Sequence, residues 1–210
     1  MDAKAQIAKL FDAERAVRSI HAELLAEDPK ALLAAAGPAA REALSMKDAA
    51  EATVRLVRVA ELLAEVPGDE SADLLVDILG SEQGEARLSA GEALEERGYS
   101  RFKELALAVE RALDRLPKES VALEELPYLL AEIPEPGVTK LLARFLKLDS
   151  AEAVSAAIEA LVEVGDPSAT KLLEPLATDK RTVNVAGEAS ITIGELAREA
   201  GDLLRRVKPE

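Results

Sequence analysis

Apolar residues recur at three- and four-residue steps along most of the chain, a spacing that gathers them into one stripe on a helix. From about residue 2 to residue 27, this stripe consists of Ile7, Leu10, Phe11, Val17, Ile20 and Leu24. It predicts a long amphipathic helix at the N-terminus. Asp28-Pro29 then predicts the start of a helix, and Gly37-Pro38 predicts that two short helices follow. Ser45-x-x-Asp48 resembles a capping box ahead of the next helix.

Beyond residue 47 the apolar pattern repeats. Leu62-Leu63-Ala64-Glu65-Val66-Pro67 is echoed 67 positions later by Leu129-Leu130-Ala131-Glu132-Ile133-Pro134. Intermediate copies give a series of central leucines at steps of 31, 36, 31 and 43, namely Leu63, Leu94, Leu130, Leu161 and Leu204. A period in the low thirties made of two short helices is typical of an α-solenoid. We therefore predict an all-α fold, an α-solenoid of about five helix-pair repeats.

Each of the first four leucines is flanked at a fixed distance by further residues of the repeat. Closely packing residues precede it by four positions (Val59, Ala90, Leu126, Ala157), and turn residues follow it by four (Pro67, Gly98, Pro134, Gly165). Ala86-Arg87-x-x-Ala90-x-x-x-Leu94-x-x-x-Gly98 and Ala153-Val154-x-x-Ala157-x-x-x-Leu161-x-x-Val164-Gly165-Asp166-Pro167 resemble the short bacterial form of the HEAT-repeat (armadillo-like) family, over roughly residues 47–207. The chain departs from the family's Val-Arg step, because only Arg87 fills the arginine place.

We divide the chain into an N-terminal helical cap, residues 1–46, and a HEAT-like repeat array, residues 47–210, within one continuous domain. The N-terminal stripe either docks on the first repeat as this cap, which we prefer, or pairs with its copy in a second chain. A monomer is therefore favoured, and a homodimer through the N-terminal helix is the alternative.

The segment at about 182–193 interrupts the helical pattern. β-Branched residues alternate there on both sides of Ala186-Gly187-Glu188-Ala189, which predicts a small β-hairpin insertion. The hairpin either covers the apolar end of the array, the slightly favoured role, or binds a partner. Thr192-x-x-Glu195 predicts a capping box that starts the last helix.

Composition and charge narrow the classes of partner. The 40 acidic and 26 basic residues give a formal charge of −14, which repels nucleic-acid phosphate and anionic membranes. Residues 61–100 alone carry eleven acids against Arg87 and Arg97, a local net charge of −9. Three Phe, two Tyr and no Trp leave little for stacking bases or sugars. We therefore expect a protein partner with a basic segment, no nucleic acid and no membrane.

The side chains that usually carry chemistry are scarce. The chain has no cysteine, and His21 is its one histidine, for which we expect no chemical role. The sequence has no Gly-x-Ser-x-Gly elbow, no phosphate-binding glycine loop and no His-Glu-x-x-His motif. We therefore expect no catalysis, no cofactor and no bound metal. The absence of a signal segment and of a long apolar stretch predicts a cytoplasmic protein.

The repeat frame itself suggests a binding surface. In a HEAT-like unit the second helix lines the concave surface, and positions two before and two after the central leucine point outward. The earlier positions are Glu61, Glu92, Tyr128, Glu159 and Asp202; the later ones are Glu65, Glu96, Glu132, Glu163 and Arg206. Stacked units would align them into an acidic ladder that attracts Lys or Arg side chains. The same glutamates also suit a merely solubilising surface.

We predict partner binding by eight of these residues, Glu61, Glu65, Glu92, Glu96, Tyr128, Glu132, Glu159 and Glu163. The expected function is a non-enzymatic scaffold or adaptor for protein–protein interaction. The family resemblance implies an alternative, an enzyme accessory or chaperone subunit like the HEAT-like bilin lyase subunits. It also implies a comparison with HEAT-like DNA glycosylases, which the acidic surface and the few aromatic residues disfavour.

Overall fold

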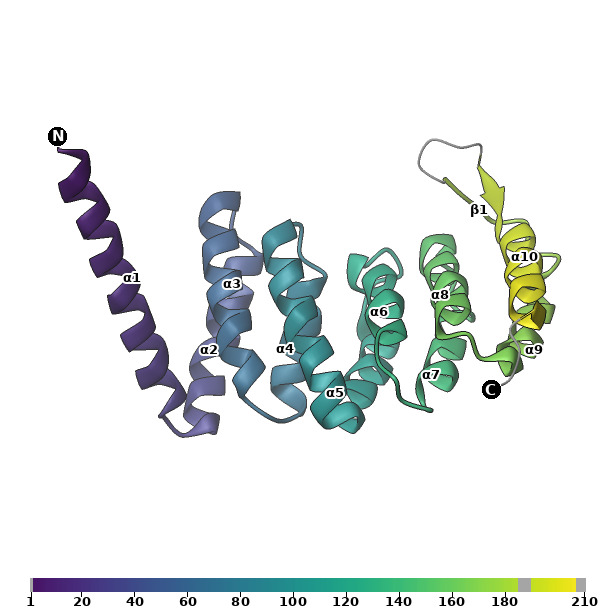
Figure 1. Ribbon diagram of the computed structural model, residues 1–210, viewed down its shortest axis with the longest axis horizontal. Helices are drawn as coiled ribbons and strands as arrows, with labels where there is room; N and C mark the ends of the chain where they lie inside the picture. The colour runs from purple at the N-terminus through teal and green to yellow at the C-terminus, as the bar shows by residue number, and fades with distance from the viewer. Residues whose placement is uncertain (1, 185–189, 207–210) are drawn as a thin grey trace.

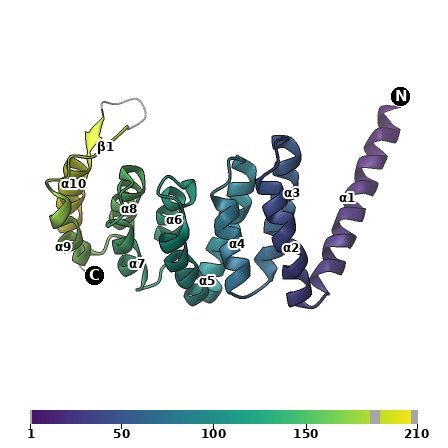
Figure 2. The same cartoon turned by 180° about the vertical axis from the view of Figure 1, so that it is seen from behind.

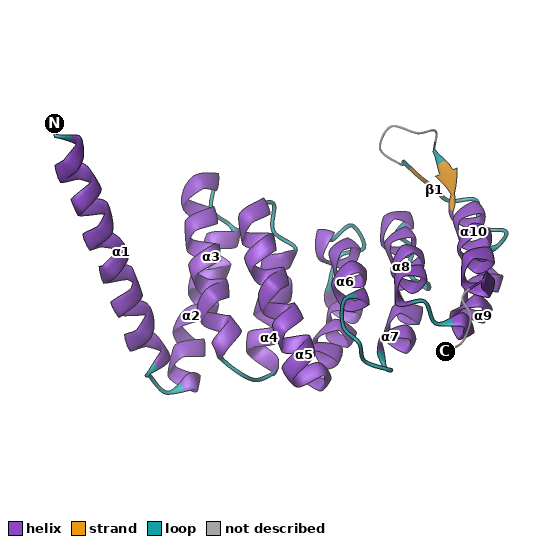
Figure 3. Ribbon diagram, viewed as in Figure 1, coloured by secondary structure: helices purple, strands orange, loops and turns teal. Residues whose placement is uncertain are grey.

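The structure of the protein, a computed structural model, describes residues 2–184 and 190–206 (Figure 1). In order along the chain, the elements are α1 (Ala3–Leu25), α2 (Pro29–Leu44), α3 (Ala49–Glu65), α4 (Asp69–Leu79), α5 (Gly84–Arg115), α6 (Val121–Ala131), α7 (Val138–Phe145), α8 (Ala151–Val164), η1 (Pro167–Ala169), α9 (Thr170–Leu173), η2 (Glu174–Leu176), β1 (Thr182–Val183), β2 (Ile191–Thr192) and α10 (Ile193–Arg206). The predicted all-α fold is confirmed, with one small antiparallel hairpin near the C-terminus (Figure 3).

The helices stand side by side as a row of pairs, which both views of the molecule show (Figures 1 and 2). Helix α5 bends at Arg101, whose φ of −148° and ψ of 49° are not helical, and each half of α5 belongs to a different pair. The pairs are α2 with α3, α4 with residues 84–100 of α5, the second half of α5 with α6, α7 with α8, and the segment 167–176 with α10. This arrangement is the predicted α-solenoid of five helix pairs.

One continuous apolar core runs between the pairs. The five central leucines lie in it without any exposed surface: Leu63, Leu94, Leu130, Leu161 and Leu204. Ala90, Leu126 and Ala157, four positions before a leucine, are also fully buried, whereas Val59 keeps 8% of its surface exposed. The spacing of the repeat thus places one helical stripe of every unit in the core.

Several predicted helix ends are in different places. α2 continues through Gly37-Pro38 as one helix, so the prediction of two short helices is wrong. Buried Ala36, Ala40 and Ala43 hold both parts of α2 against the core, which outweighs the hydrogen bond that Pro38 removes. Ser45 ends α2, and the N-cap of α3 is Asp48, whose carboxylate accepts from the N–H groups of residues 50 and 51. Thr192 and Glu195 form the predicted capping box.

Gly98 is not the turn residue that the repeat predicts. It lies inside α5, and the chain turns only at Arg101. A Cβ at Gly98 would collide with the side chain of buried Ile133, whose Cγ1 would lie at 2.9 Å. Gly98 is therefore needed for close packing between helices. Gly165, by contrast, ends α8 with a φ of 70°, a left-handed conformation that suits glycine.

The N-terminal helix α1 diverges from the row, and its N-terminal end lies far from α3 (Figure 1). No residue of α1 is buried, and its apolar stripe remains exposed except at the partly exposed Leu24. Val17, Arg18, His21 and Leu25 of α1 face α3 and α5 across a groove, and the role of α1 as a cap stays a prediction. α2, in contrast, shares the core with α3 and α4, so the proposed boundary at residue 47 separates helices of one core and stays a prediction.

The hairpin pairs Thr182 with Thr192 and Val183 with Ile191, inside the predicted range 182–193. Its predicted turn, Ala186-Gly187-Glu188-Ala189, lies outside the described residues. Val183 is buried, and β1 packs beside α8. Whether the hairpin covers the array or binds a partner stays a prediction. None of the helices that the structure describes is both long enough and apolar enough to cross a membrane.

A buried arginine joins the first two pairs. The side chain of Arg97, on α5, is fully buried, and its guanidinium donates to the carbonyl oxygens of Leu63 and Val66, both at 2.9 Å. It also donates to the hydroxyl of Ser71 at 2.9 Å and to Glu104 Oε2 at 3.2 Å. Burial lowers the pKa of Arg97, and the nearby charge of Arg101 lowers it further, while Glu104 opposes both effects. Arg97 thus satisfies the carbonyl groups that the end of α3 leaves free.

Replacing Arg97 with methionine tests this contact. Arg97→Met leaves several buried acceptors without donors, and we expect it to lower the free energy of unfolding by about 3 kcal/mol. Arg87→Met on the same helix is the control, because Arg87 is partly exposed and bonds to the carbonyls of Ser81 and Glu82; we expect it to cost less than about 1 kcal/mol. Urea denaturation monitored by circular dichroism measures both values. Equal losses would contradict the proposed role of Arg97.

A pair of glycine substitutions tests the packing at Gly98. We expect Gly98→Ala to destabilise the protein by about 1–3 kcal/mol, because the added Cβ collides with Ile133. Gly91→Ala on the same helix meets only Leu79 Cδ1 at 3.8 Å, so we expect a gain of about 0.5–1 kcal/mol from helix propensity. Denaturation midpoints that shift in the same direction for both variants would contradict this interpretation.

Candidate binding surface

The eight predicted residues lie on the second helices of four successive pairs. Glu61 and Glu65 are on α3, Glu92 and Glu96 on α5, Tyr128 and Glu132 on or at the end of α6, and Glu159 and Glu163 on α8. Glu61 is partly exposed and the other seven are exposed. The outward orientation expected from the central leucines is therefore present in all four units. We call this set the acidic ladder.

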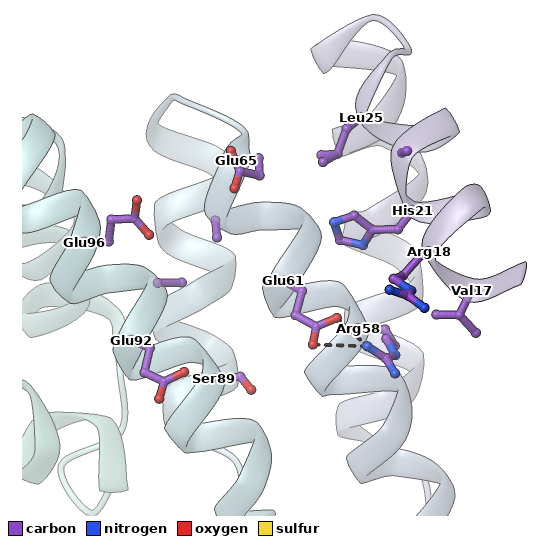
Figure 4. A pocket seen from close by; sticks show the side chains of 13 residues that line it. Val17, Arg18, His21, Leu25, Arg58, Glu61, Glu65, Ser89, Glu92 and Glu96 are labelled. Atoms are coloured by element: carbon purple, nitrogen blue, oxygen red, sulfur yellow. Dashed lines mark hydrogen bonds and ion pairs between the residues drawn. The ribbon is translucent and has the colours of Figure 1, made fainter. Parts of the chain in front are cut away.

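The first groove on this surface lies between α1, α3 and α5, with a volume of about 530 Å³ (Figure 4). One side carries four carboxylates of the acidic ladder, Glu61, Glu65, Glu92 and Glu96. The other side is α1, which contributes Val17, Arg18, His21 and Leu25 (Figure 4). Small residues such as Ala64, Ser89 and Ala93 lie between them. The groove thus combines an acidic wall with a partly apolar one.

Two more grooves continue along the array. The second, between α5 and α6, is lined by Glu92, Glu95, Glu125 and Tyr128 together with the apolar Leu79, Leu88 and Leu129. The third, between α6 and α8, is lined by Glu124, Glu125, Tyr128, Glu152, Ser155, Glu159 and the edge of the hairpin at Val183. Glu92 is shared by the first two grooves and Tyr128 by the last two, so the three are continuous. Glu132 and Glu163 lie beyond them, near the C-terminal ends of their helices.

Tyr128 is tied to the neighbouring unit. Its hydroxyl donates to Glu159 Oε2 at 2.8 Å, and the hydroxyl of Ser155 reaches the other oxygen of Glu159 at 3.3 Å. Burial raises the pKa of Tyr128 strongly, and the bond to Glu159 raises it further, so the phenol stays protonated. Since 41% of the residue's surface remains exposed, the ring is still available to a ligand, as an anchor would need to be.

Most carboxylates of the first groove have no cationic partner. Arg58 pairs with Glu61 at 2.8 Å, but among the described residues no Lys or Arg lies within 4 Å of the carboxylates of Glu65, Glu92 or Glu96. The second groove contains one long pair, Arg87 with Glu125 at 3.8 Å. The surface therefore keeps most of its negative charge unneutralised.

Three arginines form ion pairs between neighbouring first helices. Arg111 binds Asp73 at 3.0 Å and Arg115 binds Asp77 at 2.6 Å, both between α4 and the second half of α5. Arg144 on α7 pairs with Glu110 on α5. These pairs join residues more than 30 positions apart, which explains why the spacing of the leucines did not predict them. On the second helices Glu61 and Glu125 are paired with arginines, whereas Glu65, Glu92 and Glu96 are not.

Sequence reasoning also missed the role of Arg97. The position three after each of the first four central leucines holds Val66, Arg97, Ile133 and Val164. A single arginine in an otherwise apolar series is a signal that the sequence contains, and it could have identified the buried contact.

Glu124, in the third groove, lies close to other carboxylates that repel its negative charge. Burial raises its pKa, and the carboxylates of Glu152 and Glu125 raise it further. A cationic group in the groove would relieve this repulsion. The groups present can thus attract ammonium or guanidinium groups. In the part of the chain that the structure describes, no three His, Asp or Glu side chains gather in a way that could hold a metal ion.

Neutralising Glu124 tests the crowding. A raised pKa means that the folded protein holds this proton more tightly than the unfolded chain, so stability falls as the pH rises through that range. We expect Glu124→Gln to stabilise the protein at pH 7 by about 0.3 kcal/mol, a small value because the side chain is partly exposed. The gain should vanish below the ordinary glutamate pKa of about 4.3, because Glu124 in the parent is then protonated and as neutral as the glutamine of the variant. Calorimetry at both pH values measures it, with Glu135→Gln as an exposed control; a gain independent of pH would contradict the assignment.

No protein-family model and no curated protein matches the chain. Among solved structures, the chain is similar to a crystal structure described as that of an engineered protein. The two are 20% identical, the match covers 90% of this chain and 96% of the other, and the TM-score is 0.38. A likeness at this level carries no argument about fold, family or activity.

Proposed function

We propose that the protein is a non-enzymatic scaffold or adaptor whose second-helix surface binds a basic segment of another protein. The observation that carries this proposal is the unpaired state of Glu65, Glu92 and Glu96 beside the paired acids of the first helices. These three carboxylates line one groove and are left free to meet cationic side chains of a partner.

The grooves favour a segment that has both charge and apolar side chains. Second helices stack about 10 Å apart, so carboxylates recur along the surface at a spacing that successive Lys or Arg side chains can meet. Leu79, Leu88 and Leu129 in the second groove can contact the apolar residues of the same segment. The charge accelerates the encounter, and the apolar contacts together with Tyr128 contribute most of the affinity.

The rest of the proposal follows the sequence predictions. We keep the HEAT-repeat family as the proposed relationship and the cytoplasm as the proposed compartment. The alternative of a subunit resembling bilin lyases stays a prediction, which a visible-range spectrum of the purified protein tests by the presence or absence of a chromophore.

A basic peptide tests the proposed surface. The probe is a fluorescent amphipathic helix with lysines on one face, and its affinity is measured by anisotropy for the parent and for the variant Glu65→Gln/Glu92→Gln/Glu96→Gln. We expect the variant to bind about tenfold more weakly, because each lost charge pair contributes about 0.5 kcal/mol. Binding to the parent should weaken with added salt, which screens the charges.

A second triple variant controls for net charge. Glu70→Gln/Glu82→Gln/Glu135→Gln removes the same number of charges from exposed positions outside the three grooves. We expect its affinity for the peptide to stay within about twofold of the parent. An equal loss of affinity in both triple variants would mean that the peptide responds only to the total charge. Unchanged affinity in both would contradict binding of the peptide at the first groove.

A further inference from the structure

The second groove, between α5 and α6, brings apolar side chains together within the acidic surface. Its volume is about 360 Å³. Leu79, which is 4% exposed, and the partly exposed Leu129 line it. Leu88, on the same groove, keeps 63% of its surface exposed, more than any other large apolar side chain among the described residues. Apolar side chains that gather in a groove of a charged surface mark an interaction site.

Gly91 leaves this groove open because it has no side chain. It lies three positions before the central leucine Leu94. The same position of the other four pairs is buried, and it holds Ala60, Pro127, Ile158 and Gly201. Gly91 is instead partly exposed. A Cβ added at Gly91 would have Leu79 Cδ1 as its nearest neighbour, at 3.8 Å, so there is room for a further side chain beside Leu79.

Hydrogen bonds hold the polar side chains that line the groove. The hydroxyl of Tyr128 donates to Glu159 Oε2 at 2.8 Å, which keeps the ring at the edge of the groove. Arg87 donates to the carbonyl oxygen of Ser81 at 3.0 Å and lies 3.8 Å from Glu125. These long side chains are therefore already ordered, and a ligand that enters the groove loses less free energy to their immobilisation.

Carboxylates lie on both sides of the apolar lining. Glu92 belongs to the first and second grooves, and Glu125 to the second and third. The matching segment therefore has an apolar residue between basic residues. Neighbouring second helices lie about 10 Å apart, and seven residues of a helix advance by about 10 Å. A helical segment would thus reach the adjacent grooves with lysines about seven positions before and after the apolar residue.

We propose that the second groove holds one leucine side chain of the bound segment, placed beside Gly91 and flanked by basic residues. A leucine there covers Leu88 and Leu129 and removes their surface from water, whereas a charged side chain would meet the apolar lining unpaired. This inference rests on the proposed binding of a basic segment, and it adds the residue that anchors the segment.

Two fluorescent peptides measure the anchor. Both are lysine-rich helices of equal charge, with leucine at the central position of one and alanine at that position of the other, and anisotropy gives the dissociation constant of each. We expect the parent to bind the leucine peptide about tenfold more tightly, because the larger side chain loses more apolar surface to the groove. Dissociation constants within about twofold of each other would overturn the anchor.

Gly91→Leu fills the groove with a side chain of the protein itself. We expect the preference for the leucine peptide to fall below about twofold, and the alanine peptide to bind within about threefold of its affinity for the parent. Leucine has a higher helix propensity than glycine, so the melting temperature should not fall. A lost preference in a protein that is not destabilised cannot come from unfolding. A preference that stays about tenfold would overturn the assignment to Gly91.

Two further variants complete this test. Ala35→Leu adds the same side chain at an exposed position of α2 outside the three grooves, and it should keep the preference of about tenfold. Leu88→Gln removes exposed apolar surface from the groove and should lower the preference about threefold. If Gly91→Leu melts below the parent, Leu88→Gln decides, and an unchanged preference in that variant overturns the anchor.

The acid substitutions separate this inference from the proposed function. Glu65→Gln/Glu92→Gln/Glu96→Gln should weaken both peptides by the same factor and leave the ratio of their affinities within about twofold of the parent's. If both peptides weaken but the parent has no preference for leucine, the basic segment is supported and the anchor is overturned. A tenfold preference that is insensitive to the acid substitutions supports the apolar groove and overturns the proposed charge recognition. A parent that binds neither peptide overturns both.

Discussion

The fold depends at one point on a charge held inside the core. Helix α3 ends at Glu65, just before Pro67 and Gly68, and leaves carbonyl groups that the next helix cannot satisfy. The guanidinium of Arg97 reaches the carbonyls of Leu63 and Val66 from the following pair and reaches Gly68 O at 3.2 Å. In a solenoid each unit touches only its neighbours. This side chain therefore adds specific hydrogen bonds to the apolar contacts by which the first pair stacks on the second.

Other charged residues also connect neighbouring units. The basic residues form ion pairs between successive first helices, such as Arg111 with Asp73 and Arg144 with Glu110. The second helices keep acids without such partners, and Tyr128 and Glu159 bond to each other across two units. The charged groups that join the units are thus largely separate from those available for binding. This separation is what connects the stacking of the array to the proposed binding of a basic segment.

The two ends of the array depart from the regular repeat. At the N-terminal end, α1 diverges and leaves most of its apolar stripe exposed. At the C-terminal end, a first helix broken into the short segments 167–176 packs against α10, and Gly194 allows α10 to approach the carbonyls of Ala177 and Asp179.

Local spacing determined most of the helices, the five buried leucines, the capping box at Thr192 and the outward orientation of the ladder, because a helical period fixes which side chains face the core. It did not determine that α2 continues through Pro38. Only the tertiary structure decided that Arg97 is buried, that Gly98 packs against Ile133 and does not turn the chain, and that α1 stands apart. It also decided which glutamates remain unpaired. These features depend on contacts between residues some 30 or more positions apart, and no local pattern contains them.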